Sequence, residues 1–434
     1  MTTLKKVAYS LGSLGASLPS QTFYTYVIFF YVDHLKLPAS WIALVWLFYG
    51  LWNAINDPLF GYLSDRTRSR LGRRIPYILF GTLPLPLAFF LIWTPPSNLS
   101  TTLGLFAYFT GIVFLFDTMY TLVILNWTAL YPEMYSTLEE RAFVSVLRQI
   151  FGMVGVIGGI ALAPLVYGSL GWRGMGFLFS VITAISLFIS LSGSKERKEY
   201  KGEPLNILPA LKFTLLNSSF ITYVLYYLLV QFTLVLLMAT TPFYVKYALR
   251  LGEVENSLLL LSCFLVAFLS LYPWSKMAVR YGARFVAIAS AISFAISLIS
   301  TYFVSSLPAG IIAFAFIGLG LGGLIFIPDV LLAQIVDEDR IKTGVRREGM
   351  YFGANALFIR LSISFQGLVL GFVLSRTGYC PELMVQPLSA IAGIRLLMSG
   401  IPIVALLISL FFIYQYPLYG ERLKTLERRL KEEG

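Results

Sequence analysis

The sequence predicts an all-α integral membrane protein with twelve transmembrane helices in two six-helix halves. Three observations support this prediction. Hydrophobic residues make up 57% of the 434-residue chain and charged residues only 13%, with a mean hydropathy of +0.77, whereas soluble domains average about 25% charged residues. Twelve segments are long and apolar enough to span about 30 Å of hydrocarbon. Lysine and arginine gather at alternate connections between these segments.

The first half, residues 1–192, contains six of the apolar segments. Backbone groups in lipid must hydrogen-bond internally, and the segments lack the alternating pattern of barrel strands, so each is predicted to be a helix. Turn-like sequences such as "LKLPAS" and "TPPSNLS" separate them. The predicted helices span residues 7–32, 39–63, 75–94, 102–130, 142–168 and 174–192.

A charged connection at 193–213 is the longest between predicted helices, and it leads into the second half, residues 214–415. Two equal sets of helices joined in this way are typical of transporters, although channels and membrane enzymes also contain twelve helices. Residues 416–434 are predicted to be a tail. The predicted helices of this half span residues 214–245, 256–275, 285–304, 309–335, 349–375 and 390–415.

The distribution of positive charge predicts the orientation. With the N-terminus inside, 25 lysines and arginines lie on the cytoplasmic side, five lie outside and three lie within helices. Inner loops of membrane proteins carry this excess, so both termini are expected in the cytoplasm and the protein in the plasma membrane. The net charge of +11 then faces anionic lipid headgroups, which excludes nucleic acid as the partner. We expect a monomer embedded in the bilayer.

Charged residues inside predicted helices are the first candidates for function, because ionisation at mid-membrane costs several kcal/mol. At helical spacing Tyr49, Asn53 and Asp57 share one face, with Asn56 beside them. Carboxylate and amide oxygens suit Na⁺, or a proton on the carboxyl group. Thr121 is predicted at a similar depth and could add a hydroxyl. The structural alternative is an ion pair between Asp57 and an arginine.

Two arginines, Arg148 and Arg360, lie within predicted helices of opposite halves. A guanidinium group donates hydrogen bonds suited to sugar hydroxyls, carboxylates or phosphates. The alternative is that Arg148 pairs with Asp57 and Arg360 with Asp117 as structural ion pairs. Asp117 is equally consistent with a second ion site and with a pairing role.

Several other side chains complete the predicted substrate site. Aromatic rings can stack on sugars, although most rings in so aromatic a chain serve packing or the membrane interface. Glycine-rich runs at 152–159 and 318–323 are interpreted as helix-packing faces rather than phosphate loops. The predicted substrate-contacting residues are Ser17, Gln21, Tyr120, Trp127, Arg148, Asn355 and Arg360.

The segment "SDRTRSRLGRR" (64–74) resembles the inner-loop signature of the major facilitator superfamily. Its extended basic cluster is similar to that of the glycoside–pentoside–hexuronide:cation symporter family, the branch that includes melibiose permease. The stretches at 9–33, 52–58, 120–134 and 335–354 are also similar to this family, so the resemblance covers most of the chain.

The resemblance implies the twelve-helix major facilitator fold and symport of a sugar or glycoside with Na⁺ or H⁺ by alternating access, without enzymatic activity. It implies no cofactor, and no metal beyond a co-transported Na⁺ at Asp57. It makes Asp57 the principal cation ligand, supported by Asn56 and Thr121, and places Arg148 and Arg360 near the substrate. The cytoplasmic gate is expected to comprise Asp65, Arg66, Arg73, Arg141, Asp337 and Arg346.

Three positions depart from the family pattern. Asn53 replaces the first carboxylate of the cation motif, and Ser17 and Ile124 replace acidic residues expected on helices 1 and 4. These departures motivate an alternative, a carrier of lysolipid or another amphiphile. A membrane enzyme or receptor is disfavoured, because the sequence contains no metal-ligand cluster, nucleophile–base pair or nucleotide-binding loop.

Overall fold

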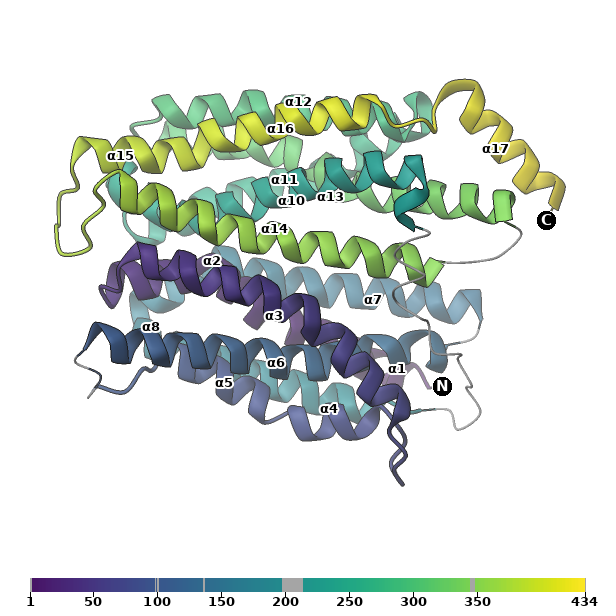
Figure 1. The fold of residues 1–434 in the computed structure, drawn as a ribbon, viewed down its shortest axis with the longest axis horizontal. Helices are drawn as coiled ribbons and strands as arrows, with labels where there is room; N and C mark the ends of the chain where they lie inside the picture. The colour runs from purple at the N-terminus through teal and green to yellow at the C-terminus, as the bar shows by residue number, and fades with distance from the viewer. Residues whose placement is uncertain are drawn as a thin grey trace. The chain divides into compact units, whose positions relative to one another are not determined.

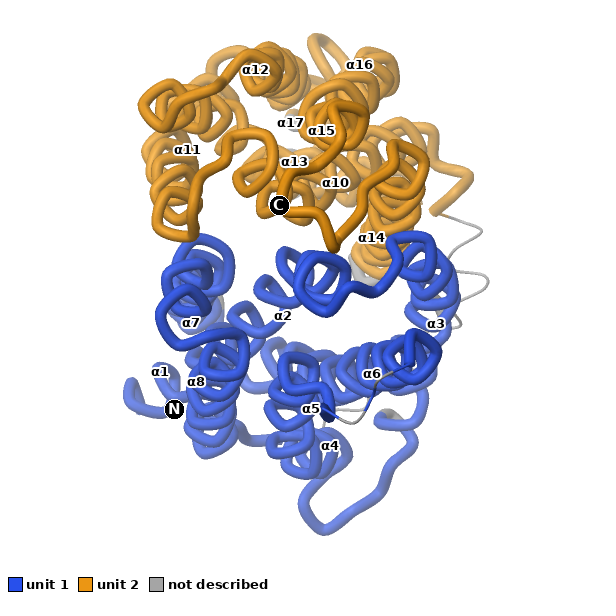
Figure 2. Tube along the Cα trace, turned by 90° about the vertical axis from the view of Figure 1, so that its left-hand side faces the viewer, with its two compact units in different colours: residues 1–204 blue, residues 205–434 orange. Residues whose placement is uncertain are grey.

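The computed structural model describes residues 2–97, 99, 101–135, 137–196, 214–343 and 348–433. These residues form helices and connecting loops, with no strand among them (Figure 1). The chain divides into two compact units, residues 1–204 and 205–434 (Figure 2). The division falls within the connection that the sequence places at 193–213.

The first unit makes six membrane crossings. The first crossing joins two helices and a π-helical turn, the third is split in two, and the fifth and sixth follow each other closely. Its elements are α1 (Thr3–Ser10), α2 (Gly12–Phe29), η1 (Phe30–His34), α3 (Ala39–Arg66), α4 (Ile75–Gly81), α5 (Pro84–Ile92), α6 (Thr102–Met134), α7 (Leu138–Val156), η2 (Ile157–Leu162) and α8 (Ala163–Gly193).

Two breaks in this unit have clear local causes. The third crossing is interrupted between Gly81 and Pro84, because proline has no N–H group with which to continue the helical ladder. Within α8 the backbone leaves the helical conformation at Gly171, where φ is 71°. Glycine adopts this left-handed region without steric cost, and the break separates the fifth crossing from the sixth.

The second unit also makes six crossings and ends in an additional helix. Its elements are α10 (Ser218–Phe243), η3 (Tyr244–Leu249), α11 (Glu253–Tyr281), α12 (Ala283–Phe303), α13 (Leu307–Thr343), α14 (Glu348–Arg376), α15 (Leu388–Arg395), η4 (Leu396–Gly400), α16 (Ile401–Tyr414) and α17 (Gly420–Glu433). The sequence did not predict α17, which lies within the expected tail.

Nine helices among the described residues are long and apolar enough to cross a membrane. One of them, Glu139–Gly193, has 55 residues and makes two crossings, because it is broken at Gly171. Two further helical crossings, α2 with η1 and α3, contain the polar side chains described below. The predicted twelve crossings in two sets of six are therefore confirmed.

Close packing of the helices depends on glycine at several contacts. A Cβ atom on Gly159 would lie 2.7 Å from the Leu18 carbonyl oxygen of α2. In the second unit, a Cβ atom on Gly322 of α13 would lie 2.5 Å from the Ala267 carbonyl oxygen of α11. Both distances are too short for a side chain. The runs 152–159 and 318–323 are thus helix-packing faces, as predicted.

The fourth crossing of each unit is longer than its apolar segment. The sequence predicts ends at residues 130 and 335, whereas α6 continues to Met134 and α13 to Thr343. A helix does not need to end where the hydrocarbon ends, because its backbone remains hydrogen-bonded in water. These extensions carry the buried acidic residues described in the next section.

Candidate functional site

A buried hydrogen-bond network joins α3 to α6 in the first unit. Asp117 lies at its centre and is 3% exposed. The Tyr49 hydroxyl donates to Asp117 Oδ1 at 2.9 Å, and Asn56 Nδ2 donates to Asp117 Oδ2 at 2.9 Å. A carboxylate in the membrane interior requires such donors, because burying a charge without hydrogen bonds is costly.

Asp57 joins the same network through Thr121. Thr121 Oγ1 donates to Asp57 Oδ1 at 3.0 Å and accepts a hydrogen bond of 3.0 Å from Asn56 Nδ2. Three of the four residues predicted for the cation site therefore lie together: Asp57, Asn56 and Thr121. The fourth, Asn53, is 2% exposed and lies one helical turn before Asp57 on α3.

The network contains two carboxylates, because Asn56 and Thr121 connect Asp117 to Asp57. Two like charges in one buried site favour the uptake of a proton or a cation. The Asn56 Oδ1 atom is buried and has no hydrogen-bond partner, so it is available as an additional oxygen ligand. The spacing of Asp117 and Thr121, four residues apart on one helix, was a sequence signal for this arrangement.

No group of three or more histidine, cysteine, aspartate or glutamate side chains that could hold a metal ion occurs among the described residues. A site for a hard cation here would use the two carboxylates together with amide and hydroxyl oxygens. Such mixed oxygen donors are those that hard cations prefer. The donor set is equally able to stabilise a protonated carboxyl group.

A cavity of about 360 Å³ lies against α2, α6 and α7 of the first unit. Three residues predicted to contact substrate line it, namely Ser17, Trp127 and Arg148, and so does Ile124. Four of the six other lining residues are polar, and the remaining two are alanine and glycine. The complete lining is Ser13, Ala16, Ser17, Ile124, Trp127, Thr128, Ser145, Arg148, Gln149 and Gly152.

Arg148 is the charged residue of this lining. Its guanidinium carbon lies 4.6 Å from the centre of the Trp127 ring and 4.8 Å from that of Tyr131. Its Nε atom is buried without a hydrogen-bond partner. Asp57, which the sequence offered as a structural partner, is instead bonded to Thr121, and no ion pair of Arg148 occurs among the described residues.

The hydrogen-bond network and the cavity meet on α6. Thr121 belongs to the network, whereas Ile124 and Thr128 line the cavity. These residues follow one another at three- and four-residue spacing, so they share one face of the helix. A rise of 1.5 Å per residue places Thr121 about 4.5 Å along the axis from Ile124. One helix, α6, therefore carries residues of both the network and the cavity wall.

The remaining residues predicted to contact substrate are not in the lining of this cavity. Gln21 is half-buried on α2, one turn after Ser17, and the Tyr120 ring lies 6.0 Å from that of Phe116. Asn355 and Arg360 lie on α14 of the second unit, where Asn355 is buried and Arg360 is half-buried.

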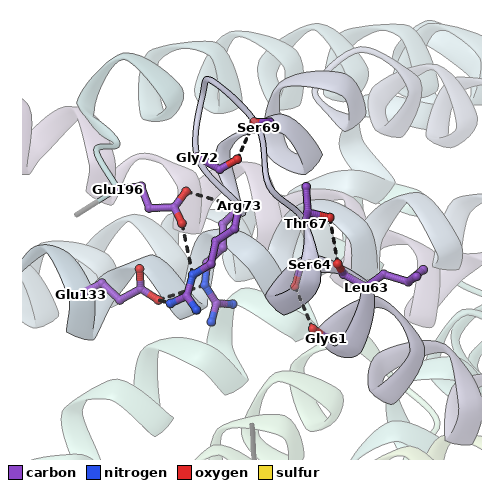
Figure 3. Close-up of polar contacts among 10 residues, drawn as sticks. Gly61, Leu63, Ser64, Thr67, Ser69, Gly72, Arg73, Glu133 and Glu196 are labelled. Carbon is purple, nitrogen blue, oxygen red and sulfur yellow. Dashed lines mark hydrogen bonds and ion pairs between the residues drawn. The ribbon is translucent and has the colours of Figure 1, made fainter. Parts of the chain in front are cut away.

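A cluster of ion pairs, which we call the Glu133 cluster, fixes the loop between α3 and α4. Arg73 Nη2 lies 2.6 Å from Glu133 Oε1, and Arg74 Nε lies 3.0 Å from the same oxygen. Arg73 Nε lies 3.2 Å from Glu196 Oε1, and the Arg74 backbone N–H donates to Glu196 Oε2 at 3.0 Å. Figure 3 shows Glu133 and Glu196 converging on the arginine side chains.

The shape of this loop depends on Gly72, where φ is 107°. A Cβ atom at this position would overlap the Glu196 carboxylate. The Thr67 side chain caps the preceding helix by donating to the Leu63 carbonyl oxygen at 2.8 Å. The glycine of "LGRR" therefore permits both the backbone turn and the approach of Glu196.

The second unit contains a related arrangement, the Glu338 cluster, near the end of α13. Glu338 Oε1 lies 2.8 Å from Lys342 Nζ and 2.9 Å from Arg422 Nη2 of α17. Glu338 Oε2 accepts a hydrogen bond of 2.6 Å from Ser219 at the start of α10. The sequence did not identify Glu133, Glu196 or Glu338, because their arginine partners lie far from them in the chain.

The predicted gate residues have varied environments. Arg73 pairs with Glu133 and Glu196 of its own unit, and the Arg66 guanidinium lies 4.1 Å from the centre of the Tyr62 ring. Arg141 Nε donates to the Tyr135 carbonyl oxygen at 2.7 Å, and burial raises the pKa of the Tyr135 phenol, which therefore stays neutral. Asp337 lies near the end of α13. The Asp65 side chain and the whole of Arg346 lie outside the described residues.

Asp329 is a further charged residue inside a predicted span, and it was not among the predicted site residues. It lies on α13 within the span predicted at 309–335, and its side chain is exposed. The carboxylate in an otherwise apolar segment was the signal that could have identified it.

A family model described as MFS/sugar transport protein matches residues 8–420. An isoprimeverose transporter of Lactiplantibacillus pentosus is 26% identical to this chain, over 99% of this chain and 92% of its own length. A sodium-dependent lysophosphatidylcholine symporter of Danio rerio is 23% identical, over 99% of this chain and 88% of its own length.

The fold is also similar to that of solved transporters. The crystal structure of the nucleoside transporter NupG aligns with a TM-score of 0.68 at 14% sequence identity, covering 96% of this chain and all of that chain. This likeness concerns the fold alone. Together with the family match, it establishes a multi-pass membrane transporter.

Proposed function

Because this chain belongs to the MFS/sugar transport protein family, in the glycoside–pentoside–hexuronide:cation symporter branch of the major facilitator superfamily, we propose that it symports a sugar or glycoside with Na⁺ or H⁺. The proposed mechanism is alternating access, in which the binding site opens to one face of the membrane at a time. We place the protein in the plasma membrane as a monomer with both termini in the cytoplasm. The excess of positive charge on one side supports this orientation.

One observation carries the proposal: a two-carboxylate network and a polar cavity share a face of α6. In the proposed mechanism, the cation binds at Asp57 and Asp117 and removes the repulsion between them. Thr121 is then held between α3 and α6. Ile124 lies one turn away in the cavity wall, so cation binding stabilises one position of that wall.

The cavity supports recognition of a hydroxylated substrate. Arg148 offers N–H donors, one of them a buried Nε without a partner. Ser17 and its neighbouring hydroxyl and amide groups donate and accept hydrogen bonds. The Trp127 ring supplies a flat apolar surface, against which a sugar ring can pack. These groups match a molecule that carries several hydroxyls on a partly apolar ring.

We further propose that the predicted gate residues respond to substrate passage. Arg73 forms ion pairs with two carboxylates of its own unit. In the proposal, these ion pairs fix the cytoplasmic end of α6. Asp65, Arg66, Arg141, Asp337 and Arg346 complete the proposed gate. Breaking and remaking of charged contacts at this end would then accompany opening toward the cytoplasm.

Transport in proteoliposomes tests the proposal. Vesicles containing the purified protein are first loaded with unlabelled sugars and screened for counterflow of labelled mono- and disaccharides and aryl glycosides. Accumulation of the best substrate is then driven by an imposed Na⁺ or H⁺ gradient. We expect counterflow of at least one glycoside and gradient-driven accumulation with one of the two cations.

The variant Asp57→Asn separates coupling from binding. It is expected to abolish gradient-driven accumulation while counterflow persists, because exchange does not require net cation movement. Glu382→Gln, a substitution at an exposed loop residue, is the matched control and should accumulate substrate normally. Accumulation that survives in Asp57→Asn would show that Asp57 is not the coupling residue.

A second candidate function is transport of a lysolipid or another amphiphile. It is favoured by Ile124, an apolar side chain in the cavity lining at a position where the family pattern has an acid. The similar protein of Danio rerio carries the name of a lysophosphatidylcholine symporter. Uptake of a fluorescent lysolipid by the same vesicles, without counterflow of any sugar, would favour this function over the first.

A further inference from the structure

Asp329 is an exposed carboxylate in a strongly apolar helix of the second unit. It lies on α13, Leu307–Thr343, whose apolar stretch has a mean hydropathy of 2.4. A charged side chain in contact with hydrocarbon costs several kcal/mol, so intramembrane acids face water, a partner or a ligand. The structure gives the Asp329 carboxylate no hydrogen bond or ion pair among the described residues.

The direction of Asp329 differs from that of three exposed apolar side chains in the first half of the same helix, although the exposed Ile325 lies four residues before it on nearly the same side. Ile312, Phe316 and Leu319 are exposed at helical spacing and share one face of α13. At 3.6 residues per turn, Asp329 lies roughly 100° around the helix from that face. It therefore points away from the stripe formed by Ile312, Phe316 and Leu319.

Polar groups of α10 lie near Asp329. Its carboxylate interacts electrostatically with Tyr223 and Tyr227. Gln231 Nε2 donates to the Tyr227 hydroxyl at 2.6 Å, which leaves the phenol proton and the amide oxygen for other partners. The rings of Tyr223 and Tyr227 are stacked with centres 5.7 Å apart, and the Tyr223 hydroxyl is buried without a hydrogen-bond partner.

Several features of the two fourth crossings are related by one constant offset in the sequence. The first residues of α6 and α13, Thr102 and Leu307, are 205 residues apart. The same spacing relates Glu133 to Glu338, each a buried acid that pairs with arginine. It also relates Ile124 to Asp329. Ile124 lines the cavity of the first unit, and Asp329 lies at the position of α13 with the same sequence offset.

We propose that Asp329, with Tyr227 and Gln231, binds hydroxyl groups of a polyhydroxylated substrate such as a sugar. A carboxylate accepts two hydrogen bonds from neighbouring hydroxyls, and such charge-assisted bonds are about twice as strong as neutral ones. The phenol and the amide add a donor and an acceptor, and the stacked rings add an apolar face. This inference rests on the proposed sugar transport.

The environment of Asp329 differs from that of the proposed ion site. Asp117 is enclosed by two donors and is 3% exposed, which suits a small dehydrated ion. Asp329 is open, and among the described residues no second carboxylate accompanies it in this cluster. An open single acid beside phenol and amide groups suits a larger ligand that brings its own hydroxyls.

The test compares Asp329→Asn with wild-type protein in proteoliposomes, using the glycoside identified by counterflow and its deoxy analogues. Losing one or two charge-assisted hydrogen bonds should raise the KM of the glycoside about tenfold to a hundredfold. With wild-type protein, one deoxy analogue should have a KM that is raised by a similar factor. With Asp329→Asn, the KM of that analogue should be little higher than the KM of the glycoside itself. The dependence of transport on pH and Na⁺ should stay unchanged.

Asp329→Glu and Glu382→Gln are the companion variants. The first keeps the charge but displaces it, so an intermediate KM is expected, and the second should match wild type. Size-exclusion profiles and thermal unfolding confirm that each variant is folded. An unchanged KM in Asp329→Asn overturns the inference, as does a variant that alters only the pH or Na⁺ dependence. Absence of glycoside counterflow by wild-type protein would instead overturn the proposed function itself.

Discussion

Glu133 and Glu338 occupy the same place in the two units, near the end of the fourth crossing, but different parts of the chain neutralise them. Glu133 pairs with Arg73 and Arg74 of the loop between α3 and α4, whose side chains are 18% and 13% exposed. Glu338 pairs with Lys342 of its own helix and with Arg422 of α17, whose side chains are 51% and 52% exposed.

The difference follows from the length of one connection. In the first unit, the eight residues 67–74 lie between α3 and α4 and supply the arginines. In the second unit, Gly282 alone separates α11 from α12, so no side chain of a long loop can reach α13. The C-terminal helix supplies the arginine instead. The buried acid is thus the repeated feature, whereas its cationic partner depends on local chain length.

Among the substitutions that test this comparison, Glu133→Gln should cause the largest loss of unfolding free energy. It removes the carboxylate that Arg73 and Arg74 share, although Arg73 keeps its contact with Glu196. Breaking a largely buried pair of this kind costs about 3 kcal/mol of unfolding free energy. Thermal unfolding in detergent measures the loss, with Glu382→Gln as the surface control. A loss no larger than that of the control would mean that the cluster is not stabilising.

Gly72→Ala should cause the second largest loss of unfolding free energy. The added Cβ forces a positive φ on a non-glycine residue and overlaps the Glu196 carboxylate, at a cost of about 2 kcal/mol. The same unfolding assay applies, and Gly111→Ala is the matched control, because a Cβ there meets no neighbouring atom. Equal stabilities of the two variants would contradict the role of Gly72.

Glu338→Gln should destabilise the protein by only about 1–2 kcal/mol, because its cationic partners are half-exposed and remain hydrated. Ser219 can still donate its hydrogen bond to the amide oxygen. The comparison with Glu133→Gln is made under identical detergent and salt conditions. A loss as large as that of Glu133→Gln would remove the proposed difference between the two clusters.

Arg422→Gln should have the smallest effect, about 0.5 kcal/mol, since exposed charges contribute little. Combined with Glu338→Gln it should add almost nothing, because the two residues share one contact. Hydrogen exchange of α17 gives a second measurement, in which protection falls in either single variant. If the losses of unfolding free energy add up in the double variant, Glu338 and Arg422 do not act through one shared contact, and other contacts hold α17 in place.

The fold was largely predictable because its physical determinants are local. Apolar length specifies each crossing, whereas the sidedness that the lysines and arginines indicate stays a prediction. The ends of α6 and α13 were predicted too early, because their final turns lie beyond the apolar segment and are held by ion pairs such as Glu338–Arg422. The amphipathic α17 was missed for a similar reason, since its charges suggested only a solvated tail.

The candidate site was predictable where helical spacing alone carries information. Asp57, Asn56 and Thr121 were identified because an acid inside an apolar helix is unusual and its neighbours follow from the spacing. The sequence did not decide between the two roles considered for Asp117, because only tertiary packing shows that Asn56 contacts it. The partners of Arg73 could not be deduced, since Glu133 lies 60 residues away on another helix.

The length of α6 has a mechanical consequence. It is one continuous helix from Thr102 to Met134, and it bears Asp117 and Glu133 sixteen residues apart. At 1.5 Å per residue they are about 24 Å apart, so a tilt of about 5° around Asp117 would displace Glu133 by about 2 Å. That displacement is comparable to the reach of the bonds to Arg73. In the proposed mechanism, a small tilt of α6 when a cation binds at Asp117 would therefore suffice to break the contact between Glu133 and Arg73.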